Sequence, residues 1–168
     1  MNKTRTIFIV ILVLMIFLAG VAIVFSVTKD DRSANKLLGN SSKEADEIDS
    51  KHMRDFKIID VDKYLELYNS DKTSVIIIGR TGCEYCSIAE PILKNISYVY
   101  EVDFYYLSID TFSDDDGTKF LESDEYFKEK GGVNTPTILI VNKGIVDMNV
   151  GLDDTEGYEK FFKDNNII

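Results

Sequence analysis

The sequence is poor in the side chains that bind soft metals, with two cysteines and one histidine, His52, among 168 residues. A structural zinc ion normally takes four cysteine or histidine ligands, and one copy of this chain does not supply them. A zinc site shared between two chains stays open. Basic residues are also scarce, since 19 Lys and Arg face 29 Asp and Glu for a net charge of −10. A chain this acidic lacks the cationic surface that nucleic acid requires, and anionic lipid headgroups repel it.

Charged side chains are entirely missing from residues 7–27, "IFIVILVLMIFLAGVAIVFSV". As a helix this run would span about 31 Å, which matches a hydrocarbon core of ~30 Å. A cleaved signal peptide is the alternative, but the run is longer than the usual apolar region of ~7–15 residues. The residue directly after "LAG" is Val21 and not a cysteine, which excludes a lipoprotein attachment there. Because Lys3 and Arg5 precede the run, we expect residues 1–6 in the cytoplasm and a single-pass anchor that carries the rest outside the cell.

The remainder divides into a polar tether at 28–52 and a globular domain at 53–168. Within the domain, apolar patterning predicts strands near 56–59, 74–79, 102–110, 137–142 and 144–150, and helices near 60–70, 87–101, 117–132 and 154–166. The β-branched run 74–79 is typical of a central strand that is buried on both faces. Alternating strands and helices followed by a hairpin predict an α/β fold with a mixed sheet between two helix layers.

Both cysteines lie in "TGCEYCSIAEP", between the predicted central strand and a helix. A structural staple is one interpretation, although a loop this short constrains the unfolded chain little. A redox pair is the other. Cys83 would lie at the helix N-terminus, where free N–H groups and the helix dipole stabilise a thiolate. Cys86 would follow one turn later. A strand, a CxxC and a helix in this order indicate a redox motif.

Further motifs extend this pattern beyond the cysteines. Pro91 lies eight residues after Cys83, "LSID" ends the next predicted strand, "NTPTILIVNKG" precedes the hairpin, and "VG" closes the last strand. In this combination residues 56–168 resemble the thioredoxin superfamily. The stretch "GRTGCEYC" is also similar to the thioredoxin-like bacteriocin transport accessory proteins.

The resemblance implies a three-layer thioredoxin-like fold and a redox-active disulfide between Cys83 and Cys86. Cys83 would be the nucleophile and Cys86 the resolving thiol. Pro136 would lie beside them after a cis peptide bond, and Thr135 would offer backbone groups to an extended substrate. No cofactor and no metal is implied. The partners would be a disulfide-containing protein or peptide and a membrane or extracellular thiol that exchanges electrons with the pair.

The chain also departs from the family. Gly82 stands where thioredoxins usually carry Trp, which opens the rim of the site. Ile77 replaces a buried acid that moves protons, and Tyr106 replaces its lysine partner. Glu90, on the helical face of the cysteines, is an alternative proton acceptor, although we expect it to be a solvated residue before Pro91.

Two acidic features bear on the direction of electron flow and on substrate preference. The pair Glu84-Tyr85 lies between the cysteines, and the Glu84 carboxylate should raise the pKa of the Cys83 thiol. A raised pKa favours a reductase or isomerase over a strong oxidase. Arg80 would oppose this effect if it folds over the site. We expect "TFSDDDGTK" (111–119) to be a solvated loop, and the alternative is a lip near the site that attracts cationic peptides.

The sequence therefore predicts a membrane-anchored, extracytoplasmic thiol–disulfide oxidoreductase. One alternative is a tethered binding or chaperone-like accessory module for a secreted peptide. The other is the opposite topology, in which the domain lies in the cytoplasm and acts as a thioredoxin-like reductase. The absence of Trp and the rich use of Lys, Asn, Ile and Asp suggest a bacterium of low G+C content.

Overall fold

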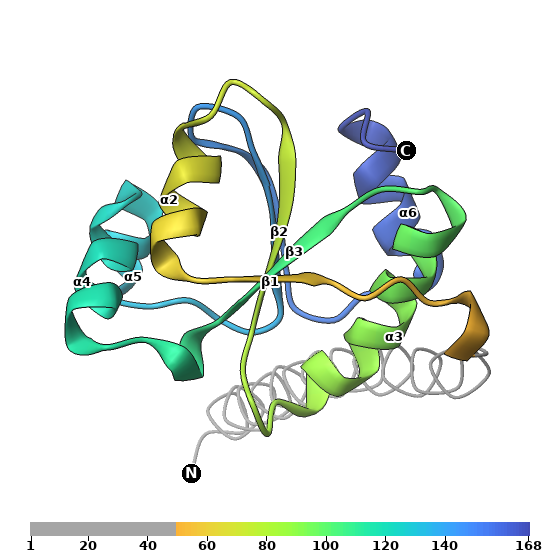
Figure 1. The fold of residues 1–168 in the computed structure, drawn as a ribbon, viewed down its shortest axis with the longest axis horizontal. Helices are drawn as coiled ribbons and strands as arrows, with labels where there is room; N and C mark the ends of the chain where they lie inside the picture. The colour runs from red at the N-terminus through yellow and green to blue at the C-terminus, as the bar shows by residue number, and fades with distance from the viewer. Residues whose placement is uncertain (1–49) are drawn as a thin grey trace, which may run out of the picture. The chain divides into compact units, whose positions relative to one another are not determined.

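The computed structural model of the chain describes residues 50–168 (Figure 1). The predicted transmembrane segment 7–27 and nearly all of the predicted tether 28–52 lie outside this range. Within it, the chain begins with a short 3-10 turn, η1 (Ser50–His52), and the side-chain amide of Asn95 donates a hydrogen bond of 3.0 Å to the His52 carbonyl. No helix of residues 50–168 is long and apolar enough to cross a membrane.

The sheet has five strands in the order β1-β3-β2-β4-β5. Their bounds are Lys57–Ile59 (β1), Ser74–Gly79 (β2), Phe104–Ser108 (β3), Thr137–Val141 (β4) and Ile145–Val150 (β5). Strand β2 is central, as its apolar run predicts, with β3 parallel on one side and β4 antiparallel on the other. Strands β4 and β5 form the predicted hairpin around residues 142–144. The sheet is therefore mixed.

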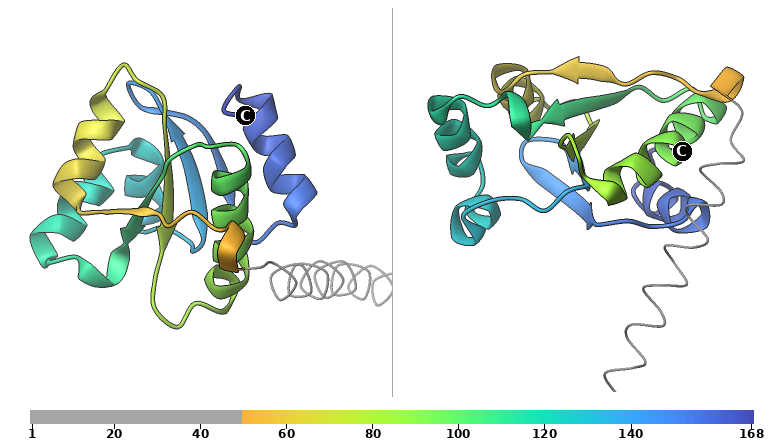
Figure 2. Two further views of the ribbon diagram at one scale, coloured as in Figure 1. Left: turned by 45° about the vertical axis from the view of Figure 1, so that its right-hand side comes forward. Right: turned by 90° about the horizontal axis from the view of Figure 1, so that it is seen from below.

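Helices cover both faces of the sheet, so the three-layer prediction is confirmed (Figures 1 and 2). Helices α3 and α6 lie on one face, and α2, α4 and α5 lie on the other. The bounds are Val61–Asn69 (α2), Glu84–Val99 (α3), Asp114–Glu122 (α4), Glu125–Lys130 (α5) and Thr155–Asp164 (α6). Asp60 caps α2 by accepting a hydrogen bond of 2.8 Å from the Lys63 backbone N–H.

Alternation along β2 divides the core into two clusters. Val75 and Ile77 pack with the buried residues of α3 and α6. Ile76 and Ile78 pack with those of α2, α4 and α5. All four side chains are almost completely buried. This packing on both faces fixes the position of β2, the strand that leads into the cysteines.

The expected single helix at 117–132 is wrong, because two helices occupy this stretch. The break falls at Ser123 and Asp124. The Ser123 hydroxyl shares a hydrogen bond of 2.9 Å with that of Tyr64 in α2, and Asp124 accepts one of 2.7 Å from the Tyr68 hydroxyl. Asp124 also caps α5 through the backbone N–H of Tyr126. These contacts with α2 end one helix and begin the next.

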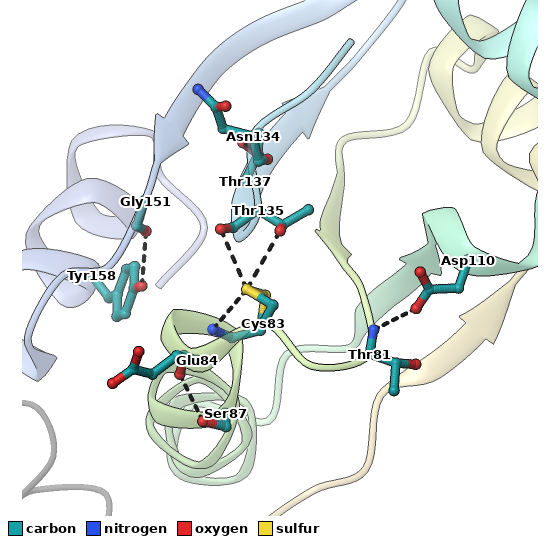
Figure 3. Close-up of a disulfide and its surroundings, with 11 residues drawn as sticks. Thr81, Cys83, Glu84, Ser87, Asp110, Asn134, Thr135, Thr137, Gly151 and Tyr158 are labelled. Atoms are coloured by element: carbon teal, nitrogen blue, oxygen red, sulfur yellow. Dashed lines mark hydrogen bonds between the residues drawn. A yellow bond between two sulfur atoms is a disulfide. The ribbon is translucent and has the colours of Figure 1, made fainter.

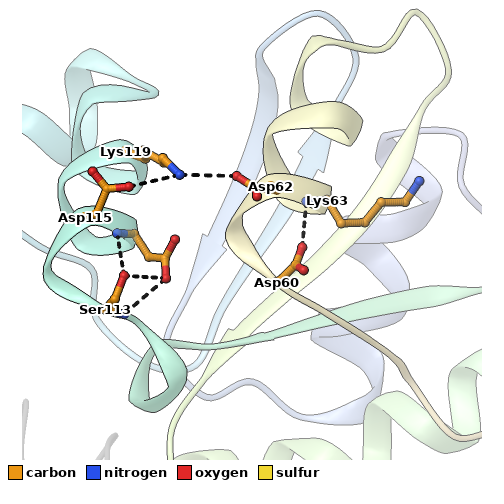
Figure 4. Close-up of polar contacts among 7 residues, drawn as sticks. Asp60, Asp62, Lys63, Ser113, Asp115 and Lys119 are labelled. Carbon is orange, nitrogen blue, oxygen red and sulfur yellow. Dashed lines mark hydrogen bonds and ion pairs between the residues drawn. The ribbon is translucent and has the colours of Figure 1, made fainter.

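The expected acidic loop at 111–119 is also wrong for most of its length, because its aspartates form the first turn of α4 (Figure 4). Ser113 caps the helix by accepting from the Asp116 backbone N–H at 3.1 Å, and the Asp116 carboxylate accepts from the Ser113 backbone N–H at 3.2 Å. Lys119 pairs with Asp115 at 3.1 Å and with Asp62 of α2 at 3.5 Å. Acidic residues in the first turn favour the helix through its dipole.

Candidate active site

The candidate site forms where three segments meet at one end of the sheet. Because β2 and β3 are parallel, their carboxyl ends lie together, and because β4 is antiparallel to β2, its beginning lies at the same end. The loop 80–83, Asp110 and the residues before β4 are therefore neighbours although they are far apart in sequence (Figure 3).

Cys83 and Cys86 form a disulfide at the N-terminus of α3. Cys83 is the capping residue of this helix, and its Sγ accepts a hydrogen bond of 3.2 Å from the Cys86 backbone N–H. Cys83 is partly exposed, whereas Cys86 is only 3% exposed. An incoming thiol or disulfide therefore reaches Cys83 and not Cys86.

Thr135 approaches the same sulfur from the opposite side. Its hydroxyl donates to Cys83 Sγ at 3.4 Å, and its carbonyl oxygen also lies 3.4 Å from that sulfur. The Thr135-Pro136 peptide bond is cis, as expected. The sequence predicted a role for the backbone of Thr135 only, so the contact of its hydroxyl is an addition. A threonine next to the expected proline was the available signal.

Asp110 was also missed as a site residue. Its carboxylate accepts a hydrogen bond from the backbone N–H of Thr81, two residues before Cys83 (Figure 3). This hydrogen bond, with a smaller contribution from the charge of Arg80, lowers the pKa of Asp110. Asp110 thus ties the end of β3 to the loop that presents Cys83. The parallel pairing of two strands, each followed by polar residues, was the signal that could have indicated it.

A groove of about 680 Å³ surrounds Cys83. It is lined by Arg80, Gly82, Cys83, Glu84, Tyr85, Ile109, Val133, Asn134, Thr135, Val150 and Gly151. Tyr85 and Val150 are 49% and 44% exposed and give the rim an apolar character. Gly82 has φ +70°, and a Cβ there would meet nothing within 4 Å, so the rim is open at this position.

Glu84 lies on the rim with its side chain in solvent, where water and salt screen its charge. The structure therefore brings Glu84, Tyr85 and Thr135 together around Cys83. Asp114, Asp115 and Asp116 do not line this groove, and their place in α4 does not support an acidic lip.

In residues 50–168, no three His, Cys, Asp or Glu side chains are grouped so that they could hold a metal ion. The two donors that converge on Cys83 Sγ are suited to a thiolate, because hydrogen bonds to a charged sulfur favour its ionised form. The arrangement can therefore perform thiol–disulfide exchange at Cys83, with Cys86 as the neighbouring thiol.

Comparison with known proteins gives a likeness of structure alone. No protein-family model matches the chain, and no curated protein matches it. The thioredoxin of Malassezia sympodialis is 22% identical, with a TM-score of 0.51, over 67% of this chain and 92% of that one. Thioredoxin f2 of Chlamydomonas reinhardtii is 14% identical, with a TM-score of 0.51, over 68% and 99% of the two chains. The domain at residues 50–168 therefore has the thioredoxin-like fold.

Proposed function

We propose that this chain is a thiol–disulfide oxidoreductase. One observation carries the proposal: a disulfide at a helix N-terminus has one sulfur in an open groove and the other buried behind it. An inert staple would gain nothing from this asymmetry. Disulfide exchange needs it, because the substrate must reach one sulfur while the other waits to displace it.

The reaction has two steps. The thiolate of reduced Cys83 attacks a substrate disulfide, forms a mixed disulfide and releases one substrate sulfur as a thiolate. The thiolate of Cys86 then attacks Cys83 Sγ, forms the Cys83–Cys86 disulfide and releases the second substrate sulfur. Two electrons pass to the substrate, and an external dithiol must return them, because the chain has no third cysteine.

Three features support a reactive Cys83 thiolate: its position at the N-terminus of α3, the Cys86 backbone N–H and the Thr135 hydroxyl. The Glu84 carboxylate acts in the opposite direction, with an effect that solvent weakens at this exposed position. A strongly stabilised thiolate makes a pair oxidising, and a carboxylate beside the thiol reduces that tendency. The proposed direction is therefore reduction or isomerisation of substrate disulfides.

The proposed location is the outer side of a cell membrane, with residues 7–27 as a single-pass anchor. The support is the uncharged length of that run and the basic residues before it. The proposed substrates are secreted or surface proteins and peptides, and the proposed electron donor is a membrane or extracellular thiol. Protease treatment of intact cells tests the location, since a cytoplasmic domain would be protected.

Turnover by the full-length chain in detergent tests the activity. With dithiothreitol as reductant, the chain should reduce a protein disulfide, and Cys83→Ser should abolish this. Cys86→Ser should instead accumulate a mixed disulfide with the substrate, because the second step is lost. If the native chain shows no turnover and Cys86→Ser traps no substrate, the enzyme proposal fails, and a tethered binding module takes its place.

The reduction potential of the pair tests the direction. A value near ~−270 mV is typical of a reductase such as thioredoxin, and a value near ~−120 mV is typical of a strong oxidant. Equilibration of the full-length chain with glutathione or dithiothreitol buffers measures it. The oxidising value would contradict the proposed direction and leave the proposed chemistry intact.

A further inference from the structure

The second step of the reaction requires Cys86 to lose a proton, and its surroundings oppose this. Cys86 is almost completely buried. Burial disfavours the charged form of a thiol, and only the thiolate attacks a disulfide. Ile77, on the central strand, is also buried and has no group that could accept the proton. A proton acceptor must therefore come from another element.

Glu90 is placed to be that acceptor. It follows Cys86 by four residues in α3, and side chains with this spacing lie on the same helical face with Cβ atoms about 5–6 Å apart. Helical side chains lean toward the N-terminus, which is the direction of Cys86 from Glu90. Contrary to the expectation of a solvated residue, Glu90 is only partly exposed. A general base acts at hydrogen-bond distance or through one water molecule, and side chains with this spacing are close enough for a bridging water.

Tyr106 of β3 borders the same surface hollow as Glu90 and lies within reach of its charge. Its ring belongs to the core cluster between the sheet and α3. Burial raises the pKa of Tyr106 to about 12, and the nearby charge of Glu90 adds to the effect. The phenol is therefore neutral at physiological pH and keeps a proton that it can donate to Glu90. Gly79 makes room for it, since a Cβ at position 79 would lie 2.2 Å from the Tyr106 hydroxyl.

Glu90 also has a route to water. It borders a surface hollow of about 380 Å³ together with Asp55, Phe56, Ile58, Lys94 and Tyr106. The charged neighbours facing it from other parts of the hollow are Lys94, which pairs with Asp55 at 3.2 Å, and Asp55 itself. The charge of Asp110, just after the carboxyl end of β3, also raises the pKa of Tyr106. A proton taken up by Glu90 can leave through this hollow without passing the cysteines.

We propose that Glu90 accepts the Cys86 proton in the resolving step and that Tyr106 is its positioning residue. This inference rests on the proposed function. The Cys86 S–H bond breaks, its proton moves to a Glu90 oxygen, and the sulfur keeps the electron pair. That pair forms the bond to Cys83 Sγ, while the substrate sulfur leaves with the pair of the broken mixed disulfide. Glu90 then releases the proton to water.

A single-turnover reaction of the reduced, full-length chain with dithio-bis-nitrobenzoate separates the two steps. The first nitrothiolate released reports attack by Cys83, and the second reports resolution by Cys86. The test variants are Glu90→Gln and Tyr106→Phe. The matched controls are Glu122→Gln, at an exposed position in α4, and Tyr105→Phe, at the preceding residue of β3.

Glu90→Gln should leave the first phase unchanged and slow the second on the order of 100-fold near neutral pH, a typical loss for a general base. The deficit should shrink as pH rises, because hydroxide replaces the carboxylate. Tyr106→Phe should slow the second phase less and shift its pH profile. If the second phase of Glu90→Gln equals that of Glu122→Gln at every pH, the inference is overturned. If the native chain lacks the first phase, the proposed function fails instead.

Discussion

Replacement of Thr135 by valine tests the most direct contact with the reactive sulfur. Valine keeps the shape of threonine and removes the hydroxyl that donates to Cys83 Sγ at 3.4 Å. The Cys86 backbone N–H, at 3.2 Å, remains as a donor. The change therefore removes one of two hydrogen bonds and leaves the disulfide geometry in place.

The expected size follows from the contact. A hydrogen bond to a charged group contributes about 1.5–3 kcal/mol, and the long contact to sulfur places this one at the lower end. A loss of about 1.4 kcal/mol corresponds to one pKa unit, so Thr135→Val should raise the pKa of the Cys83 thiol by about one unit. Where Cys83 is ionised, the reduced form loses the same stability, and the reduction potential should fall by about 30 mV.

The pH dependence of Cys83 alkylation in the reduced, full-length chain measures the pKa, and equilibration with a thiol buffer measures the potential. Thr118→Val is the matched control, because the Thr118 hydroxyl donates a hydrogen bond to the Asp114 carbonyl within α4 and does not line the groove. Identical pKa values for Thr135→Val and Thr118→Val would refute the reasoning. They would mean that the Thr135 hydroxyl turns away from the thiolate once the disulfide is reduced.

Three further outcomes follow from other contacts. Gly79→Ala should lower the free energy of unfolding in urea by about 1–3 kcal/mol, because the new methyl group would collide with the Tyr106 hydroxyl. The loss should be smaller in a Tyr106→Phe background, and an equal loss in both backgrounds would contradict this explanation. Ser113→Ala should lower stability by about 1 kcal/mol and leave the salt dependence of turnover of a basic disulfide peptide unchanged, because the acidic turn caps α4 away from the groove. Asp110 has a lowered pKa in the folded state, so its ionised contact stabilises the fold above the unfolded pKa of about 4 and is lost as pH falls through the folded value. Asp110→Asn should therefore be less stable than the native chain at neutral pH and equally stable in strong acid. A constant difference in stability at every pH would exclude the ionised contact with Thr81.

Local sequence patterns predicted much of the fold. The β-branched run of β2 predicted the central strand, and the Asn142-Lys143-Gly144 turn predicted the hairpin. These succeed because neighbouring residues decide them. The break between α4 and α5 contains no glycine or proline and depends on Tyr64 and Tyr68, which α2 supplies. No reading of residues 117–132 alone could supply those contacts.

The site residues also fall into two groups, those that local motifs predict and those that only distant contacts reveal. The two cysteines and the cis proline are visible as motifs, but the Thr135 hydroxyl and the Asp110 carboxylate act through contacts that only the mixed sheet creates. Their partners lie far along the chain, so spacing carries no trace of them. The predicted anchor at 7–27 stays a prediction.

The hydroxyl of Tyr158 in α6 donates to the Gly151 carbonyl at 3.2 Å (Figure 3). The same hydroxyl accepts from the Asp153 backbone N–H at 3.0 Å. Gly151 is part of the wall of the groove, so this wall is held by the last helix. During synthesis Cys83 and Cys86 leave the ribosome well before Tyr158 does. The nascent chain therefore exposes its cysteine pair before this wall of the groove can form around Cys83.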